Sequence, residues 1–219
     1  MKHLLWTLFL GLIALPCFTS CSESEDTIQE YVNWKNRNDS YFGSIRTLAH
    51  DSIALAKKAH GNAWESECNW RAYLSYSLTE DVSNKQTDSI YVQIIKRGTG
   101  TGCPLGSDSV RVNYRARLIP STSYAEGYVI GNSGHSSTFE NVFNHNISIP
   151  SAFKISNVIR GFGTALQRMH IGDLWRVYIP YNLAYGTVDY GRIPGGSTLI
   201  YEIELRGYYR AGTSTGDWN

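Results

Sequence analysis

The chain has 219 residues, of which 42% are hydrophobic and 18% are charged, and its formal net charge is +1. Without residues 1–20, which contain one lysine and no acid, it carries 19 basic and 19 acidic residues. Nucleic acids bind mainly through lysine and arginine, so this neutral balance gives no basis for a nucleic-acid partner. Beyond residue 21 there are two cysteines, Cys68 and Cys103, which are too few for a zinc site and are either free thiols or a disulfide.

The first twenty residues predict an export signal rather than part of the fold. An apolar run from Leu4 to Pro16 is too short for a permanent membrane span but suits a signal peptide. The following "FTSC" resembles a bacterial lipoprotein signal, with Cys21 as the lipidated N-terminus and Phe18 where leucine is usual; plain secretion is the alternative. The acidic "SESED" is similar to the export tag of Bacteroides-type surface lipoproteins. We therefore expect an extracytoplasmic, lipid-anchored protein at the outer membrane, on its periplasmic or cell-surface face.

Residues 21–87 predict a tether followed by a helical N-terminal region. From Ile28 to Ala59 the apolar residues recur at helical spacing, which predicts one long or two shorter amphipathic helices ending near Gly61. Residues 28–61 are also a candidate dimerisation segment. The stretch "NWRAYLSYSL" fits a strand or a loop.

From residue 88 the hydrophobic period changes to that of strands. Val110, Val112, Tyr114, Ala116 and Leu118 alternate with arginine and asparagine, which predicts an antiparallel strand with one buried face and one solvated face. Residues 119–150 are predicted to be loop. Strands are also predicted in "YVQIIKRG", "LWRVYIP" and "STLIYEIELRGYY", and residues 211–219 are predicted to be a flexible tail.

Helical spacing returns in "NVIRGFGTALQRMHIG", for about three turns, and stops at Gly172. One short helix among several antiparallel strands predicts an α+β domain, in which a twisted antiparallel sheet wraps its apolar face around the helix. The helical N-terminal region precedes this domain.

Four motifs, in order and at their spacings, resemble the FKBP-type peptidyl-prolyl cis-trans isomerases over residues 88–207. They are "VIRGFG", "MHIGD", "IPYNLAYG" and "IPGGSTLIY". The resemblance implies an FKBP-like domain at 88–210, and the helical region before it is similar to N-terminal extensions of Bacteroides-type FKBP lipoproteins. It also implies activity on X–Pro bonds in unfolded or exported proteins.

The family's chemistry needs no nucleophile, metal or cofactor, and we expect none. Rotation about an X–Pro amide has a barrier of about 18–20 kcal/mol because resonance holds the bond planar. A dry apolar pocket can hold the proline ring and favour the twisted amide. The histidines show no convincing metal-ligand spacing.

The resemblance implies a pocket whose parts come from separate segments. Phe162 would form its floor, where the family most often has tryptophan, and the Ile159 amide and the Tyr185 hydroxyl would bind substrate carbonyls. The implied catalytic residues are Tyr114, Phe162 and Tyr185, and the implied substrate-binding residues are Ile130, Val158, Ile159, Tyr190, Ile193 and Tyr201. Taken singly, residues such as Val158 and Tyr114 are by default explained by core packing, and only their joint occurrence favours a pocket.

The stretch "EGYVIGNSG" departs from the family pattern. It lacks the residues of a phosphate-binding loop. Aligned on Gly127, the usual F-D-x-S becomes Ile130, Gly131, Asn132 and Ser133, so the acid is missing. An alternative alignment places Phe139 and Glu140 there at the cost of a longer insertion. The favoured alignment predicts a slower isomerase, or a catalytically weak or inactive FKBP-fold module that binds a cell-envelope partner.

Overall fold

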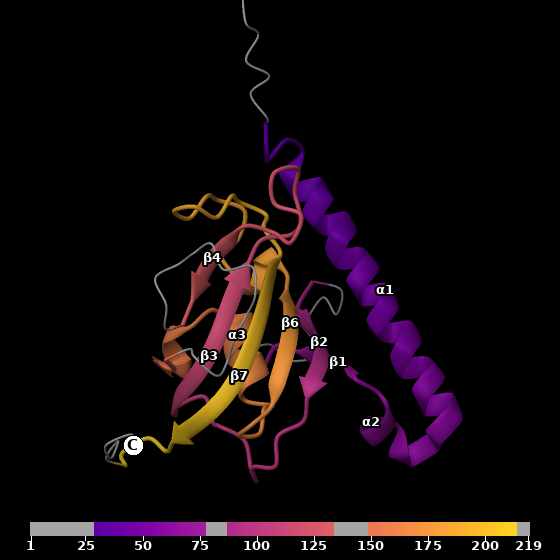
Figure 1. Ribbon diagram of the computed structural model, residues 1–219, viewed down its shortest axis with the longest axis vertical. Helices are drawn as coiled ribbons and strands as arrows, with labels where there is room; N and C mark the ends of the chain where they lie inside the picture. The colour runs from indigo at the N-terminus through magenta and orange to yellow at the C-terminus, as the bar shows by residue number, and fades with distance from the viewer. Residues whose placement is uncertain (1–28, 78–86, 134–148, 214–219) are drawn as a thin grey trace, which may run out of the picture.

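The computed structural model describes residues 29–77, 87–133 and 149–213 (Figure 1). The leader, the lipid site at Cys21 and the alternative pocket pair Phe139 and Glu140 lie outside the described residues, as does most of the predicted tail. Those assignments stay predictions.

The N-terminal region is dominated by one long helix, α1 (Trp34–His60), which ends at Gly61 with a positive φ of 54°. This confirms the predicted amphipathic helix and its end. The short η1 (Gly61–Ala63) and α2 (Trp64–Glu67) follow it. Among the described residues, none of the helices combines the length and the apolar character that a bilayer crossing requires.

Seven strands form a single sheet in the order β1-β2-β6-β7-β3-β4, with β5 also paired to β3. Every pairing is antiparallel. The strands are β1 (Trp70–Leu74), β2 (Ser89–Lys96), β3 (Ser109–Arg117), β4 (Val129–Asn132), β5 (Ser151–Lys154), β6 (Leu174–Ile179) and β7 (Leu199–Tyr209). Strand β1 precedes residue 88 yet belongs to the same sheet, so the N-terminal region is continuous with the domain.

The helix α3 (Arg160–Leu166) packs against β1, β2 and β6 on one face of this sheet. Six of its seven residues are buried, and the alternating residues Val110, Val112 and Ala116 of β3 point to the same core. Gly161 allows the close approach, because a Cβ there would lie 2.3 Å from Cγ2 of Ile179 in β6. The predicted α+β architecture is therefore confirmed, although α3 is shorter than the predicted three turns.

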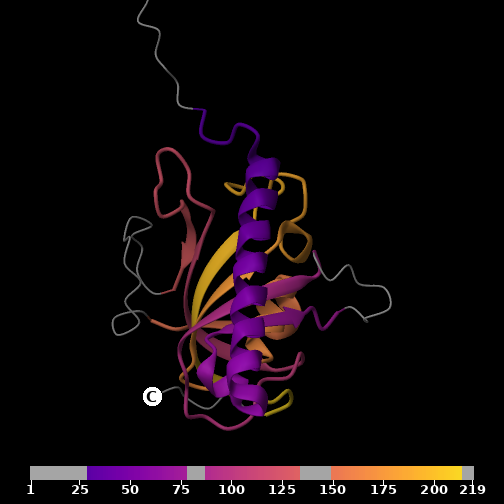
Figure 2. The ribbon, with the colours of Figure 1, turned by 90° about the vertical axis from the view of Figure 1, so that its right-hand side faces the viewer.

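The long helix α1 packs across the opposite face of the sheet (Figure 2). Phe42 contacts Tyr91 of β2 with ring centroids 5.3 Å apart. The Trp34 indole N–H donates to Ser197 Oγ at 2.8 Å, and the Thr198 amide donates to Asn38 Oδ1 at 2.7 Å. The start of α1 therefore fixes the segment that leads into β7.

The predicted solvated face of β3 was wrong. Arg115 and Arg117 are only 7% and 8% exposed, because they surround a buried carboxylate of β7. Arg115 hydrogen-bonds Glu202 at 2.7 Å, Arg176 of β6 does so at 2.7 Å, and Arg117 lies 3.8 Å away. Period-two alternation reports which residues share a face, but not whether paired charges on the polar face are covered.

Two short strands and the two cysteines also bear on the sequence predictions. The ambiguous stretch around residue 70 is strand β1, and β4 lies within the predicted loop 119–150. Both are short strands, and each pairs with a longer neighbouring strand of the sheet. Cys68 and Cys103 are free thiols in the structure, Cys68 being buried.

Candidate functional site

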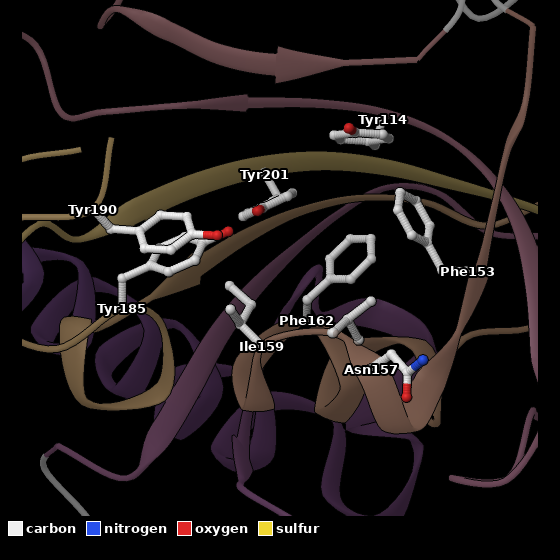
Figure 3. A pocket seen from close by; sticks show the side chains of 9 residues that line it. Tyr114, Phe153, Asn157, Ile159, Phe162, Tyr185, Tyr190 and Tyr201 are labelled. Atoms are coloured by element: carbon white, nitrogen blue, oxygen red, sulfur yellow. The ribbon is translucent and has the colours of Figure 1, made fainter. Parts of the chain in front are cut away.

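A cavity of about 300 Å³ opens between α3 and strands β3, β5 and β7 (Figure 3). Its volume suits a small apolar group such as a proline ring with its neighbouring peptide bonds. Its walls are mainly aromatic. The lining residues are Tyr114, Phe153, Asn157, Val158, Ile159, Phe162, Tyr185, Tyr190 and Tyr201.

Phe162 forms the base of the cavity and is 3% exposed. Its ring centroid lies 4.9 Å from Tyr201, 5.8 Å from Phe153 and 6.2 Å from Tyr114, all within the range of favourable aromatic contact. The rings come from α3, β7, β5 and β3, so the folded sheet and helix hold them in place. The result is a rigid, largely apolar surface at the bottom of the cavity.

Two stacked tyrosines form the rim. The Tyr185 and Tyr190 rings lie 4.5 Å apart at an interplanar angle of 10°, and Figure 3 shows both hydroxyls pointing toward Tyr201. Tyr190 is 61% exposed, and its segment is closed by two backbone hydrogen bonds of 2.9 Å with Ile193. This loop thus presents phenol hydroxyls at the mouth of a cavity whose walls are mainly aromatic.

The cavity offers polar hydrogens that the described protein does not use. The hydroxyls of Tyr114, Tyr185 and Tyr201 make no hydrogen bond with another described residue, and neither does the Ile159 amide. Ile159 precedes α3, where the first amides of a helix have no intrahelical partner. A bound peptide carbonyl can therefore find donors here without displacing an existing bond.

Burial raises the pKa of the Tyr114, Tyr185 and Tyr201 hydroxyls above the ordinary value of 10.0, and neighbouring tyrosines add to each shift. Burial disfavours the charged phenolate, which explains the direction. All three hydroxyls are therefore neutral donors at physiological pH.

These shifts predict alkaline destabilisation. The folded state keeps tyrosine protons that the unfolded chain loses above pH 10.0, so stability is complete below that pH and falls as pH rises toward the folded pKa values. Urea unfolding midpoints at pH 7, 9 and 11 should be equal for the first two and lower for the third. Tyr201→Phe should reduce the alkaline loss; the same loss in this variant would contradict the assignment to the cavity.

The stretch "EGYVIGNSG" does not line the cavity, but its Gly131 lies next to Tyr114, which does. A Cβ on Gly131 would lie 3.5 Å from the Tyr114 hydroxyl oxygen, in ordinary contact. Ser133 secures the strand, because its hydroxyl accepts from the Tyr114 amide at 2.9 Å and its own amide donates to the Tyr114 carbonyl at 2.9 Å. Gly127 makes the preceding turn with φ of 84°, where a Cβ would lie 2.0 Å from the Leu118 carbonyl oxygen.

The structure brings together seven of the nine residues predicted for the pocket. Ile130 is partly buried against the core and Ile193 is buried, but neither lines the cavity, and their substrate contacts stay predictions. Sequence reasoning missed Phe153 and Asn157. The signal for Phe153 was the short apolar stretch before "NVIRGFG", which pairs with β3 once folded.

No group of three or more histidine, cysteine or acidic side chains suited to a metal ion occurs in the described ranges. The cavity lining itself offers aromatic rings, tyrosine hydroxyls, the Asn157 side chain and the Ile159 backbone amide. This combination suits a neutral, partly apolar group.

Comparison with known proteins identifies the class. Residues 103–206 match the family described as FKBP-type peptidyl-prolyl cis-trans isomerase. The chain is 32% identical to a macrophage infectivity potentiator of Trypanosoma cruzi, over 74% of this chain and 73% of that protein. It is 31% identical to the FKBP-type 22 kDa peptidyl-prolyl cis-trans isomerase of Escherichia coli, over 61% of this chain and 56% of that one.

The chain belongs to the FKBP-type peptidyl-prolyl cis-trans isomerase family. It spans about half the length, 48–53%, of several other relatives, including FkpA of Aeromonas hydrophila. The crystal structure of FkpA from Escherichia coli matches with a TM-score of 0.46 at 25% identity, over 77% of this chain and 64% of that one.

Proposed function

We propose that this chain catalyses cis–trans isomerisation of X–Pro bonds in exported proteins, with turnover reduced by glycine at position 131. The observation that carries the proposal is the aromatic cavity above Phe162, in which the Ile159 amide and three tyrosine hydroxyls have no partner among the described residues. Membership of the family supports the reaction class.

The mechanism follows from the amide bond itself. Resonance between nitrogen and carbonyl gives the X–Pro bond its barrier of about 18–20 kcal/mol, and no bond has to be broken to rotate it. The proline ring would rest on Phe162, while the aromatic walls exclude the water that stabilises the polar, planar amide. Donation from the Tyr185 hydroxyl and the Ile159 amide would hold the flanking carbonyls while the bond turns.

The residue at position 131 is expected to determine how strongly the twisted amide is stabilised. In the twisted amide the nitrogen no longer donates electrons to the carbonyl carbon, so a nearby negative charge is favourable only at that stage. Gly131 supplies none. A Cβ at this position would be in ordinary contact with the Tyr114 hydroxyl oxygen, 3.5 Å away.

Gly131→Asp is expected to raise kcat/KM on a Leu–Pro peptide about tenfold, which corresponds to about 1.4 kcal/mol of transition-state stabilisation. The matched control is Gly131→Asn, which has the same size without the charge and should remain near the wild-type rate. A protease-coupled assay at low temperature measures both. Equal rates for the two variants would contradict the role assigned to the acid.

A second candidate function is a non-catalytic module that holds a prolyl segment of a cell-envelope partner. The observation that favours it is the same Gly131. Wild-type protein that binds the Leu–Pro peptide without accelerating its isomerisation would establish this second function, and acceleration above the uncatalysed rate would reject it.

The location is part of the proposal: a lipid on Cys21 would hold the protein at the outer membrane, on its periplasmic or cell-surface face. Cys21→Ser should release the protein from the membrane fraction, and mass spectrometry of the membrane form should find the acylated cysteine. An unmodified, unanchored protein would reject it.

A dimer through residues 28–61 is also proposed. The apolar face of α1 packs on its own sheet, but Leu48 and Leu55, seven residues apart, are 50% and 68% exposed. Light scattering should find a dimer that Leu48→Ser with Leu55→Ser dissociates. A monomer at all concentrations would contradict this.

A further inference from the structure

A second cavity, of about 190 Å³, lies directly beside the first and shares Val158 and Ile159 with it. One wall is α3 with the residue after it, through Arg160 and Gln167, and the other is the segment that follows β1, through Ser75, Tyr76 and Ser77. We name this second cavity the β1 groove. The β1 wall lies outside residues 103–206, the part of the chain that matches the family model.

The β1 wall is fixed in place by polar contacts with α3. Thr164 of α3 and Ser75 are 2% and 1% exposed, and their hydroxyls lie 3.5 Å apart. Ser75 Oγ lies 2.9 Å from Ser77 Oγ, and the Tyr76 amide donates to Thr164 Oγ1 at 3.4 Å. Arg168 places its guanidinium 4.5 Å from the centroid of the Tyr76 ring. These contacts thus hold the β1 wall against α3 and Arg168.

The charge that lines the β1 groove is of one sign, positive. Arg160 is the single charged side chain among its lining residues, and the others are hydroxyl, amide, aliphatic and aromatic. Arg160 is exposed and forms no ion pair within the described parts of the chain. A partner side chain that carries a carboxylate therefore gains an attraction here, and one that carries an ammonium group meets repulsion.

Resting on the proposed function, we propose that the β1 groove is a specificity subsite for the substrate segment flanking the proline, and that it favours an acidic residue. Ile159 and Thr164 are five residues apart on and before α3, a rise of about 7.5 Å. An extended chain covers about 3.3–3.6 Å per residue, so the occupant lies roughly two residues from the proline. Val158 and Ile159 line both cavities, so the two cavities are neighbours and a single extended chain over these residues would border both.

The test uses Leu–Pro peptides that carry Glu, Gln or Lys two or three residues from the proline, on either side. Affinity is measured by NMR titration and turnover by exchange NMR, at low salt. For one side of the proline we expect the Glu peptide to exceed the Lys peptide about threefold in affinity and kcat/KM, a difference typical of an exposed charge pair. Arg160→Gln should abolish the difference and Arg160→Glu should reverse it.

Lys154→Gln, which removes an exposed charge of β5 that lines neither cavity, should retain the preference. Equal values for the Glu and Lys peptides, or a preference lost equally in Lys154→Gln, would overturn the subsite while leaving the isomerase proposal intact. An Arg160-dependent affinity difference without turnover would support the subsite and reject catalysis. No binding of any peptide would overturn both.

Discussion

Phe162→Ala should lower kcat/KM for a Leu–Pro peptide by about a hundredfold or more, equivalent to about 2.7 kcal/mol. The ring is the base of the cavity and contacts the Tyr114, Phe153 and Tyr201 rings. Without it the proline ring has no flat surface to rest on, and water can reach the amide. The protease-coupled assay measures the loss.

Removal of a buried phenylalanine also costs about 3–5 kcal/mol of stability, so a control must separate folding from function. Phe42 provides one. It is 7% exposed at the interface between α1 and the sheet and does not line the cavity above Phe162. Phe42→Ala should lose comparable stability, measured by urea unfolding, and keep its turnover while folded. Equal losses of turnover in both variants would contradict the role of Phe162 in binding the proline ring.

Glu202→Gln should lower the free energy of unfolding at pH 7 by about 3–5 kcal/mol, because it leaves buried guanidinium groups without their carboxylate. Burial alone would raise the pKa of Glu202, but the hydrogen bond from Arg176 and the charges of Arg115 and Arg117 outweigh it and lower the pKa below 4.5. Urea unfolding measures the difference between the wild type and the variant.

The stability that Glu202 contributes depends on pH. Because the pKa of Glu202 is lower in the folded state, its stabilisation is complete above the unfolded value of 4.5 and is lost as pH falls through the folded pKa. The gap between wild type and Glu202→Gln should therefore close at low pH. Glu204→Gln is the matched control: Glu204 pairs with the half-exposed Arg206, so its loss should be smaller. A gap that persists at low pH would contradict the ion-pair account.

Most of the core could be predicted from local patterns. The alternation of Val110, Val112 and Ala116 predicted β3, and helical spacing up to Gly61 predicted α1. These patterns work because one face of each element is buried against the same core. The pocket residues Tyr114, Phe162 and Tyr185 could be grouped only through the family resemblance, since they come from β3, α3 and the loop after η3 (Tyr181–Leu183).

What escaped prediction depends on tertiary contacts. Arg115 and Arg117 look solvated in sequence and are buried because Glu202 lies opposite them on β7. Phe153 joins the cavity only because β5 pairs with β3. The β1 groove likewise needs Ser75 and Thr164, which are 89 positions apart, to meet. No pattern within a single segment contains these pairings.

The interpretation of the stretch "EGYVIGNSG" depends on both sequence and structure. Sequence alignment proposed that Gly131 takes the place of an acid, and the structure puts that position next to the Tyr114 hydroxyl. We therefore expect the residue at position 131 to change catalytic strength rather than the fold.

The most direct test of the central claim is exchange NMR of a Leu–Pro peptide with catalytic amounts of the wild-type protein. Uncatalysed X–Pro isomerisation takes about 10–100 s at 25 °C, so acceleration is readily seen. We predict faster exchange together with peptide-induced shifts at the Ile159 amide and the Tyr185 and Tyr201 rings. Exchange at the uncatalysed rate with saturating protein, or acceleration with no shift at these residues, would contradict it.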